Sequence, residues 1–333
     1  MATSKDVANL AGTSIATVSY VFNNGPRPVS EKTRIRVLEA ASSLGYSPNA
    51  SARALITGKT STFGLIVPSI LNPFFGELSF AVEKFAKEVG HLLLIADSSM
   101  DPSQENGHIQ EFVNRGVDGV VLVSCAAEKS GIHLLTAKGI PVVALHPVPF
   151  FPEIPSVHMD YVSAACTLAR HLLEDHDARS LLLVLAQGEA GSLDHKQGVL
   201  KAIHEGGFNA QESTLETEVS REDSYEKTII KLKGNSLPDA IYCATDEQAY
   251  GVLAALNYLG FSVPKDVKVV GFDGTRHSKF SIPPLTSMQQ PMDTLARLAI
   301  ETLTGKHQSD SSDEFLQGQL ILRESCGCQG LLK

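Results

Sequence analysis

The sequence predicts an α/β protein with a separate, all-helical head at its amino terminus. The first observation behind this prediction is the hydrophobic period. Over residues 5–45 apolar residues recur at helical spacing, whereas beyond Thr60 short continuous apolar runs alternate with amphipathic helical patterns. Continuous apolar strands separated by helices are typical of parallel sheets that are covered on both faces. The second observation is length, because 333 residues are too many for one ordinary domain and enough for sizeable cores.

Seven apolar or β-branched runs are the predicted strands of this region, with helices between them, for example over residues 75–89 and 160–174. The runs cover residues 63–68, 91–96, 118–123, 140–145, 180–186, 239–244 and 267–272. These elements are too many for one sheet, so two doubly wound subdomains are expected. The Pro-rich stretch 146–155 interrupts the alternation and predicts a break near Asp160. The last predicted strand covers residues 323–328.

Residues 3–24 have the pattern of two short helices joined by a tight turn. Thr3 and Asp6 form a start that resembles a capping box, Gly12 ends the first helix, and Thr13 or Ser14 can cap the second. The expected buried faces consist of Val7, Ala8, Leu10 and Ala11 in the first helix and Val18, Val21 and Phe22 in the second. This is the geometry of a helix-turn-helix, whose second helix enters the DNA major groove. A generic pair of helices is the alternative that this stretch alone leaves open.

A third helix is expected to begin at Ser30, with Glu31 in its first turn, and to end at Gly45. Its expected buried face consists of Ile35, Val37, Leu38, Ala41 and Leu44. Residues 1–60 contain seven Lys or Arg and three acidic residues, whereas the whole chain has a net charge of −9. A basic head on an acidic body is expected where only one end of a protein meets nucleic-acid phosphates.

Three motifs occur in order in this head: DVA-x-x-AG-x-S-x-x-TVS over residues 6–19, V-S-x-x-T-R-x-x-V over 29–37, and GY-x-PN-x-x-A-R-x-L over 45–55. Their order and spacing resemble the head and hinge of the lactose/galactose repressor (LacI/GalR) family of bacterial transcription regulators. The resemblance extends through the rest of the chain at lower density. It implies a helix-turn-helix domain over residues 1–46, a hinge over 47–60, and an effector-binding and dimerisation core over 61–333.

In that family the core is similar to a type I periplasmic sugar-binding protein, in which the chain crosses three times between two subdomains of parallel sheets flanked by helices. By this analogy, one subdomain covers about 61–159 and 291–306, and the other covers about 160–288 and 314–328. The later crossings are expected near residues 287–291 and 305–315, and the polar run 307–314 is an expected exposed loop. The carboxyl ends of both sets of strands would face one ligand cleft.

The second helix of the head carries the residues expected to recognise DNA bases. Ile15, Ala16 and Tyr20 would point into the groove, and Ile15 and Ala16 match the family's first two specificity positions. Neither of those two can hydrogen-bond a base edge, so either contact with a thymine methyl group or discrimination by DNA shape is expected. Packing inside the head is the alternative for Ile15 and Tyr20. The expected DNA contacts in the head are Thr3, Lys5, Ser14, Ile15, Ala16, Thr17, Ser19, Tyr20, Asn23 and Arg27.

The hinge is expected to add Asn49, Ala52, Arg53 and Leu55 to the DNA contacts. Residues 49–56 could form two helical turns, which is below the ~12–15 residues needed for a marginally stable isolated helix. This segment is therefore expected to be disordered without DNA and helical with it. The resemblance implies that Leu55 and its dimer partner enter the minor groove and kink the duplex. A plain flexible linker is the alternative.

Seven residues are the expected effector contacts: Phe74, Phe75, His146, Asp160, His195, Asp246 and Asp273. The resemblance implies that the aromatics of N-P-F-F (72–75) line the cleft and that Asp273 of G-F-D (271–273) accepts hydrogen bonds from the ligand. Asp160 and Asp246 match recurrent family acids. Structural roles, as a cap for Asp273 and as hydrogen-bonded histidines for His146 and His195, are the alternatives.

The expected effector site departs from the family pattern at three positions. His195 stands where relatives usually place a ligand-clamping Arg, and His146 stands where an acid or another polar residue is usual. Thr245 replaces the Asn of an N-D pair, and the chain has no Trp. The effector class therefore stays open, with a sugar or sugar phosphate as the expectation, and no cofactor is expected.

Metal binding and catalysis are not predicted from the sequence. The five cysteines are scattered, and Cys326 and Cys328 are too close for the usual zinc spacing, so reduced cytosolic thiols are expected. His171 and His176 are five residues apart, which would put them on different faces of a helix. Gly58-Lys59-Thr60 resembles the end of a phosphate loop, but Arg53 stands where the earlier Gly is needed.

The functional prediction is a homodimeric, ligand-responsive repressor of carbohydrate or related catabolic genes that binds a palindromic operator. No apolar run approaches the about 18 residues of a membrane span, and the polar first residues do not resemble an export signal, so a cytoplasmic location is expected. The alternatives are a regulator that responds to a non-sugar ligand or to a partner protein, a solute-binding protein, and a cleft that has become catalytic.

Overall fold

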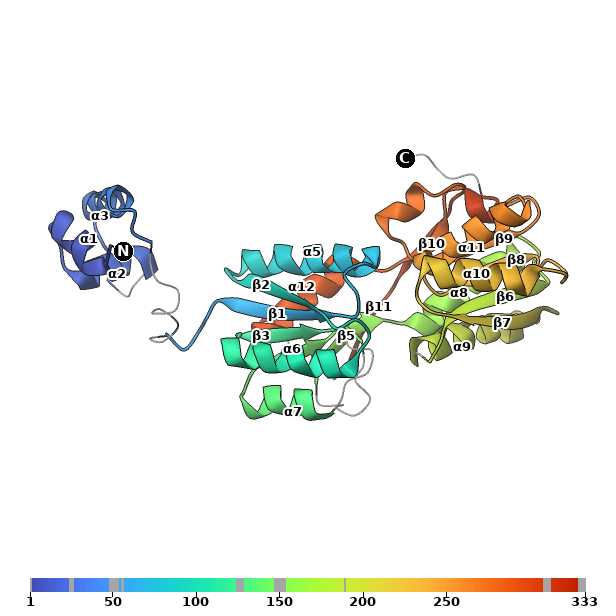
Figure 1. The fold of residues 1–333 in the computed structure, drawn as a ribbon, viewed down its shortest axis with the longest axis horizontal. Helices are drawn as coiled ribbons and strands as arrows, with labels where there is room; N and C mark the ends of the chain where they lie inside the picture. The colour runs from blue at the N-terminus through green and yellow to red at the C-terminus, as the bar shows by residue number, and fades with distance from the viewer. Residues whose placement is uncertain are drawn as a thin grey trace. The chain divides into compact units, whose positions relative to one another are not determined.

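The computed structural model describes residues 2–23, 27–47, 54, 57–123, 129–146, 154–188, 190–307 and 313–328. The chain forms two compact units, Met1–Thr60 and Ser61–Lys333. Figure 1 shows that the first unit is helical and that the second contains the sheets. The predicted α/β class with a helical head is confirmed.

The head consists of α1 (Ser4–Leu10), α2 (Ile15–Asn23) and α3 (Glu31–Ser43). The predicted capping box at the start of α1 is present, because Thr3 and Asp6 each accept a hydrogen bond from the other's backbone N–H. Ser30 caps α3, as expected. The core of the head is formed by Val7, Ala8, Ala11, Val18, Val21, Val37, Ala40 and Ala41.

Four apolar residues of the head do not enter this core. Leu10, Ile35, Leu38 and Leu44, which were expected on buried faces, are 38–58% exposed. In α3 the buried positions are Val37, Ala40 and Ala41, whose spacing of three and four residues defines one narrow face. A three-helix unit has room for one such face per helix, so the other apolar side chains of α3 stay at the surface.

The first sheet of the core is parallel and has the strand order β11-β5-β4-β3-β1-β2. Its strands are β1 (Thr62–Val67), β2 (Leu92–Asp97), β3 (Gly119–Leu122), β4 (Val142–Ala144), β5 (Ser156–Met159) and β11 (Asp313–Leu316). The helices α5 (Pro73–Glu88) and α12 (Met292–Leu303) pack on the face that contains Leu65. The other face, which contains Ile66, packs against α6 (Pro102–Arg115) and α7 (Lys129–Ala137). Alternate residues of β1 thus enter different cores.

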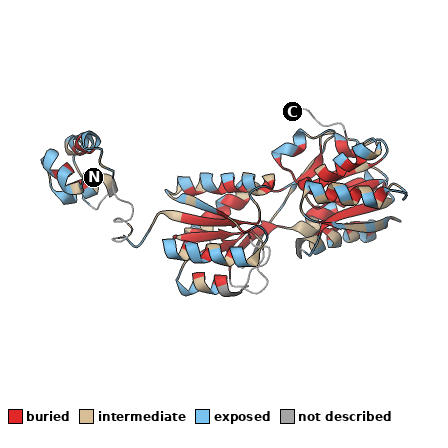
Figure 2. Cartoon of the chain, viewed as in Figure 1, coloured by how far each residue is buried: buried red, intermediate tan, exposed pale blue. Residues whose placement is uncertain are grey.

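The second sheet repeats this architecture with the order β12-β10-β9-β8-β6-β7. Its strands are β6 (Ser180–Ala186), β7 (Gln211–Thr217), β8 (Ala240–Cys243), β9 (Lys268–Asp273), β10 (Thr286–Gln289) and β12 (Gln319–Ile321), of which β12 is antiparallel to β10. The helices α8 (Tyr161–Glu174) and α9 (Ala190–Glu205) cover one face, and α10 (Arg221–Leu232) and α11 (Asp246–Leu259) cover the other. Figure 2 shows that buried residues dominate the strands and that the helices are exposed on their outer faces.

Each of the seven predicted apolar runs overlaps a strand, whereas β5, β7, β10, β11 and β12 were not predicted. The edge strand β7 escaped prediction because its sequence, QESTLET, is mostly polar and its side chains are mostly outside the core. The predicted strand at 323–328 is wrong. Residues Glu324–Cys326 form the short 3-10 helix η2, which ends at Gly327 with φ at +98°.

The chain crosses between the two sheets after β5, after β10 and after β11. The third crossing lies between Leu316 and Gln319, later in the chain than predicted. Residues 314–316, assigned from the sequence to the second subdomain, therefore belong to the first sheet, and the predicted loop 307–314 ends in β11. The error arose because β11 is a short edge strand that follows a polar run.

The three crossing segments contact one another. The backbone N–H of Asp160 donates to the carbonyl of Leu316 at 3.1 Å, which joins the first crossing to the third. A Cβ atom placed on Gly318 would lie 2.8 Å from the sulfur of Met159 and 3.2 Å from the carbonyl oxygen of Gln289. Gly318 is thus a position where the close approach of the three crossings leaves no room for a side chain.

In the described part of the chain, none of the helices has the length and apolar character that a bilayer span requires.

Candidate DNA-binding surface and effector site

Helix α2 presents the predicted recognition residues on its exposed side. The hydroxyl of Ser14 accepts a hydrogen bond from the backbone N–H of Thr17 at 3.1 Å, so Ser14 caps this helix. Ile15 is 49% exposed, whereas Val18, three residues later, is 1% exposed. Ile15 therefore does not pack in the core of the head, which removes the structural alternative for it. Tyr20 is half-buried.

The other predicted DNA contacts of the head are at its surface. Thr3, Lys5, Ser19 and Arg27 are exposed, as is Ala16. The hydroxyls of Ser14 and Thr17 lie 2.9 Å apart, so one donates to the other and the accepting hydroxyl keeps its own O–H for a phosphate contact. The side chain of Asn23 lies outside the described residues, as do Asn49, Ala52, Arg53 and Leu55 and the predicted hinge helix.

The predicted effector residues all follow the carboxyl end of a strand. Phe74 and Phe75 follow β1, His146 follows β4, Asp160 follows β5, His195 lies on the helix after β6, Asp246 follows β8, and Asp273 ends β9. This is the edge at which open α/β sheets bind ligands. Not all seven residues meet one another, however, and several are used by the fold itself.

An aromatic cluster forms around Tyr161, the first residue of α8. Its ring centroid lies 5.4 Å from that of His146, 5.9 Å from that of His195 and 5.8 Å from that of Phe272. His146 belongs to the first subdomain and His195 to the second. Tyr161 therefore contacts both His146 and His195, the two histidines that were expected to depart from the family pattern.

His195 is a buried, uncharged polar group. One ring nitrogen, Nδ1, lies 2.6 Å from the hydroxyl of Tyr242. The ring also packs edge-on against that of Phe272, with the ring centroids 4.4 Å apart. Burial, together with a smaller effect of the nearby His146, lowers the pKa of His195 to about 3. Burial also raises the pKa of Tyr242, so this hydrogen bond joins two neutral side chains.

Asp273 is the predicted ligand acceptor that the structure places beside this cluster. Its Oδ1 accepts a hydrogen bond from the amide of Gln290 at 2.9 Å, and the Oε1 of Gln290 accepts one from the hydroxyl of Tyr161 at 3.3 Å. Burial raises the pKa of Asp273 well above its ordinary value, and the charge of Asp246 adds to this effect. Its backbone has φ at +108°, a region that non-glycine residues rarely adopt and that is concentrated at functional sites.

Asp246 and Asp160 make hydrogen bonds within the fold. Asp246 is fully buried: one oxygen accepts from the N–H and the hydroxyl of Thr275 at 2.8 and 2.9 Å, and the other accepts from Ser287 at 2.6 Å. Burial raises the pKa of Asp246 to about 6 in spite of these hydrogen bonds. Asp160 caps α8 by accepting from the N–H of Ser163 at 2.9 Å. The geometry thus gives Asp246 a structural role in place of the predicted effector contact.

Phe74 and Phe75 contact each other at the start of α5 and, among the described residues, make no ring contact with the cluster around Tyr161. Phe74 is buried at the start of α5, where Asn72 caps the helix by accepting from its N–H. Phe75 packs edge-on against Phe74 with ring centroids 5.1 Å apart.

Sequence reasoning missed Tyr161, Tyr242, Phe272 and Gln290. Gln290 directly follows β10, a strand that was not predicted, so the strand-end rule had nothing to act on. Tyr161 is adjacent to Asp160, and its hydroxyl reaches a partner 129 positions along the chain. Only the spatial order of the strands shows that contact.

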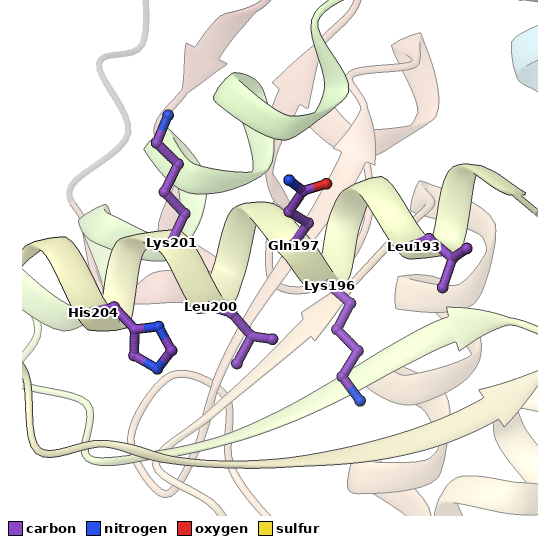
Figure 3. Close-up of a pocket in the computed structure, with 6 residues that line it drawn as sticks. All are labelled: Leu193, Lys196, Gln197, Leu200, Lys201 and His204. Atoms are coloured by element: carbon purple, nitrogen blue, oxygen red, sulfur yellow. The ribbon is translucent and has the colours of Figure 1, made fainter.

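A hollow of about 500 Å³ lies on the outer side of α9 (Figure 3). Its lining residues all come from this one helix: Leu193, Lys196, Gln197, Leu200, Lys201 and His204. It contains none of the predicted effector residues, and a single helix does not surround a ligand as cofactor and effector sites do.

The prediction that His171 and His176 point to different faces of a helix is wrong. Their Nε2 atoms lie 3.1 Å apart. Helix α8 ends at Glu174 with Asp175 as its C-cap, so His176 lies beyond the helix, where its ring can approach that of His171. The helical spacing rule does not apply beyond the last helical residue.

Comparison with known proteins accounts for both units. Residues 3–49 match the family model described as bacterial regulatory proteins, lacI family, and residues 60–317 match the model of periplasmic binding proteins and the sugar binding domain of the LacI family. The chain belongs to the LacI family. It is a DNA-binding transcriptional regulator with a helix-turn-helix head and a ligand-responsive core. Family members are transcriptional regulators, not enzymes, and they bind small-molecule effectors such as sugars.

Two curated relatives cover nearly the whole regulator. Catabolite control protein A of Priestia megaterium is 32% identical over 325 residues, which are 96% of this chain and 98% of that protein. The HTH-type transcriptional repressor PurR of Glaesserella parasuis is 30% identical over 309 residues, which are 92% of this chain and 91% of that protein.

Solved structures of this family share the fold. The lac repressor dimer bound to operator and the anti-inducer ONPF has a TM-score of 0.85 at 22% identity, covering 98% of this regulator and 99% of that chain. The complex of the transcriptional regulator CelR with cellobiose has a TM-score of 0.69 at 25% identity, covering 98% of this regulator and 100% of that chain.

Proposed function

We propose that this LacI-family regulator represses carbohydrate or related catabolic genes, binds a palindromic operator as a homodimer, and changes its operator affinity when an uncharged, sugar-like effector occupies the core. One observation carries the effector part of this proposal. The hydrogen-bonded path from Tyr161 through Gln290 to Asp273 links two of the crossing segments at the strand ends.

The exposed side of α2 supports sequence-specific DNA binding. Ile15 and Ala16 are exposed at the start of the helix, and a recognition helix reads bases mainly with its first residues. The family relation adds that two heads of a dimer address two inverted half-sites, because the operator mirrors the twofold axis of the protein. Because the proposed operator lies on the bacterial chromosome, the proposed location of the protein is the cytoplasm.

The chemistry of the cluster favours a sugar over a sugar phosphate. His146, Tyr161, His195, Asp273 and Gln290 offer aromatic faces and hydrogen-bonding groups, and none of these five residues is Lys or Arg. Sugar hydroxyls need carboxylate and amide partners, and their C–H faces pack on aromatic rings. A phosphate group needs a cation or a bidentate Arg, and His195, with its low pKa, is neutral. The cellobiose bound by the structurally similar CelR is an uncharged sugar.

The same path supplies a mechanism for the response. Tyr161 lies on the first crossing and Gln290 on the second, so a ligand that hydrogen-bonds Asp273 competes with or reinforces the contact between the crossings. Such a ligand has different free energies of binding to the two arrangements of the subdomains, which is the requirement for a population shift. A coupling of about 1–3 kcal/mol changes operator affinity about 5- to 150-fold.

The hinge connects this shift to DNA. We propose that residues 49–56 become helical on operator and that Leu55 enters the minor groove, where unstacking costs a few kcal/mol and the bend permits further contacts. Replacing Leu55 with Ala should weaken binding to a palindromic operator. Equal affinity of the variant and the parent would contradict this role for Leu55.

Selection of genomic fragments by the purified protein tests the DNA part. Fragments that contain two inverted half-sites should be enriched over bulk DNA, and their affinity should fall steeply with salt because phosphate contacts release counterions. Enrichment of single half-sites would contradict the dimer, and the absence of any enrichment at low salt would contradict sequence-specific binding.

A thermal-shift screen against neutral sugars, sugar phosphates and nucleosides tests the effector part. The ligand should raise the melting temperature of the core, and it should change operator affinity in fluorescence anisotropy. A response to sugar phosphates alone would contradict the uncharged effector. A response that appears only after addition of a partner protein would replace the small-molecule mechanism.

A further inference from the structure

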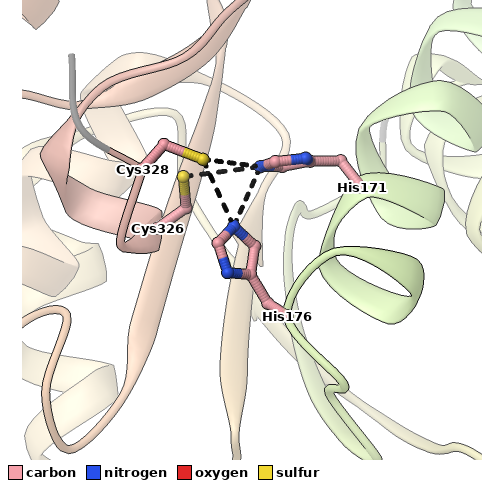
Figure 4. Close-up of side chains that lie close together, drawn as sticks. All are labelled: His171, His176, Cys326 and Cys328. Carbon is pink, nitrogen blue, oxygen red and sulfur yellow. Dashed lines mark hydrogen bonds between the residues drawn. The ribbon is translucent and has the colours of Figure 1, made fainter.

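Two histidines and two cysteines meet in the second subdomain at a place that the effector site does not use (Figure 4). His171 lies in the last turn of α8, His176 follows that helix, and Cys326 and Cys328 belong to η2 and the residues after it. We call these four residues the His–Cys cluster. Each offers one potential metal-ligand atom, and these atoms all lie within 4.8 Å of one another.

The separations in the His–Cys cluster match those around a tetrahedral zinc ion. Zinc bonds of about 2.0–2.1 Å to nitrogen and about 2.3 Å to sulfur put two nitrogens about 3.4 Å apart and a nitrogen about 3.6 Å from a sulfur. The two Nε2 atoms lie 3.1 Å apart. Three of the four nitrogen–sulfur distances are 3.4 Å from His171 to Cys326, 3.7 Å from His171 to Cys328, and 3.5 Å from His176 to Cys328, and the fourth is within 4.8 Å.

The surroundings of the His–Cys cluster are also those of a metal site. The second ring nitrogen of His171, Nδ1, lies 2.7 Å from a carboxylate oxygen of Asp175. A metal-binding histidine commonly donates its other N–H to a carboxylate, which fixes the ring and leaves the first nitrogen free to bind. The cluster is buried on the side of His171 and Cys326 and partly exposed at His176 and Cys328, so an ion has a route of entry.

We propose that the His–Cys cluster binds one Zn²⁺ ion as a closed structural site with two nitrogen and two sulfur ligands. Tetrahedral S₂N₂ sites favour zinc, and four protein ligands leave no open position for catalysis. Binding releases the thiol protons to solvent and joins each sulfur to the ion. Neither the effector nor the DNA part of the proposed function is needed for this site.

The bound ion would link the segment after β12, through Cys326 and Cys328, to the carboxyl end of α8. His171 and Cys326 are 155 positions apart, so the site closes a long loop of the chain. Tyr161, at the centre of the aromatic cluster in the candidate effector site, is the first residue of α8, at the other end of this helix. The ion would therefore hold the helix whose first turn faces the effector.

The test begins with the full-length protein purified under reducing conditions without chelator. Elemental analysis should find about one zinc per chain. Removal of the ion should lower the melting temperature, and adding Zn²⁺ should restore it. Replacement by Co²⁺ should produce the intense visible absorption and sulfur-to-metal charge-transfer bands of tetrahedral cobalt with thiolate ligands.

Single substitutions distinguish ligands from bystanders. Cys328→Ser changes a partly exposed ligand and should abolish zinc retention, whereas Cys328→His keeps a ligand and should bind Co²⁺ with weaker charge-transfer absorption. Cys166→Ala, on the same helix α8 but outside the His–Cys cluster, should retain the full zinc content, as should His204→Gln.

Two results would overturn the site. The first is that reduced protein holds no zinc as purified and gives no cobalt spectrum on reconstitution, which would show a network of hydrogen-bonded thiols and imidazoles only. The second is a Cys326–Cys328 disulfide, found by mass spectrometry, in protein purified with reductant. If Cys328→Ser fails to fold, the cobalt spectrum of the parent and of Cys166→Ala still decides between these outcomes.

Discussion

In the head, the residues proposed to recognise DNA lie together because they share one helix. Ile15, Ala16 and Tyr20 lie within the nine residues of α2, and their neighbours in the sequence are their neighbours in space. In the core, Tyr161 meets Gln290 across 129 positions, and Gln290 in turn meets Asp273 across 17. A substitution in α2 is therefore expected to affect one DNA contact at a time. A substitution in the network of Tyr161, Gln290 and Asp273 is expected to affect both subdomains.

The largest expected effect is at Asp273. Asp273→Ala removes the acceptor for Gln290 and for the effector, so the roughly 5- to 150-fold change in operator affinity on adding effector should disappear. Operator affinity without effector should stay the same, because Asp273 is not among the proposed DNA contacts. Fluorescence anisotropy with and without the sugar found in the thermal-shift screen measures both quantities.

Asp273→Asn is the matched control for this change. Its amide oxygen can still accept from Gln290, so the crossing contact should persist and part of the response should remain. An unchanged response in Asp273→Ala would remove Asp273 from the effector site.

The second prediction concerns the crossing segments. Gly318→Ala places a methyl group 2.8 Å from the sulfur of Met159 and 3.2 Å from the carbonyl oxygen of Gln289, so the crossings must shift. The free energy of unfolding of the core should fall by about 1–3 kcal/mol. Urea unfolding followed by circular dichroism measures it.

Gly76→Ala, on α5, provides the comparison for Gly318→Ala. A methyl group there meets no atom within 4 Å, so this variant should gain about 0.5–1 kcal/mol from reduced backbone entropy. Equal effects of the two substitutions would show that the crossings are loosely packed.

The third prediction tests the local character of the head. Tyr20→Ala should change the base preference of operator binding, since a good side-chain contact to a base is worth about 1–3 kcal/mol of discrimination. Selection from a randomised operator library measures that preference. Lys5→Ala should weaken all sequences alike and reduce the salt dependence, because a phosphate contact carries no base information. A uniform loss in Tyr20→Ala would contradict its role in recognition.

The smallest expected effect is a pH dependence of core stability that originates in His195. Its pKa is lowered by burial to about 3 in the folded protein, against about 6.5 in the unfolded chain. Between these values the unfolded state binds the extra proton, so stability is lost as the pH falls below 6.5. Lowering the pH from 7 to 5.5 should cost about 1 kcal/mol through this residue.

Urea unfolding of the parent and of His195→Gln at both pH values measures this contribution. The variant should lose about 1 kcal/mol less than the parent on acidification. His204→Gln, an exposed histidine of the same helix, should behave as the parent does. Equal losses in the parent and in His195→Gln would show that His195 is not held neutral by burial.

Prediction from the sequence succeeded where the signal is local. The caps at Thr3 and Ser30 and the seven apolar runs were recognised because helix starts and buried strands have a signature within a few residues. It failed at the edge strands β7 and β11, because an edge strand with a polar sequence has little buried surface and little apolar pattern. It also failed at the interior strands β5 and β10, which are only four residues long and contain polar residues.

The candidate sites divide in the same way. Ile15 was assigned to the exposed side of its helix through its match to the family's specificity positions, and it is exposed. Asp246 could not be recognised as a structural acid from the sequence, since its partners Thr275 and Ser287 follow 29 and 41 positions later. His171 and His176 were separated by a helical rule that ends where the helix ends.

The sequence by itself determined the helices of the head, seven of the strands, the charge of the head and the family to which the chain belongs, because each depends on residues close together in the chain. The tertiary structure decided which distant side chains meet: Tyr161 with Gln290, and His171 with Cys326. The physical reason is that the order of strands in a parallel sheet follows from how the helices pack across it, and that order brings remote strand ends to one edge.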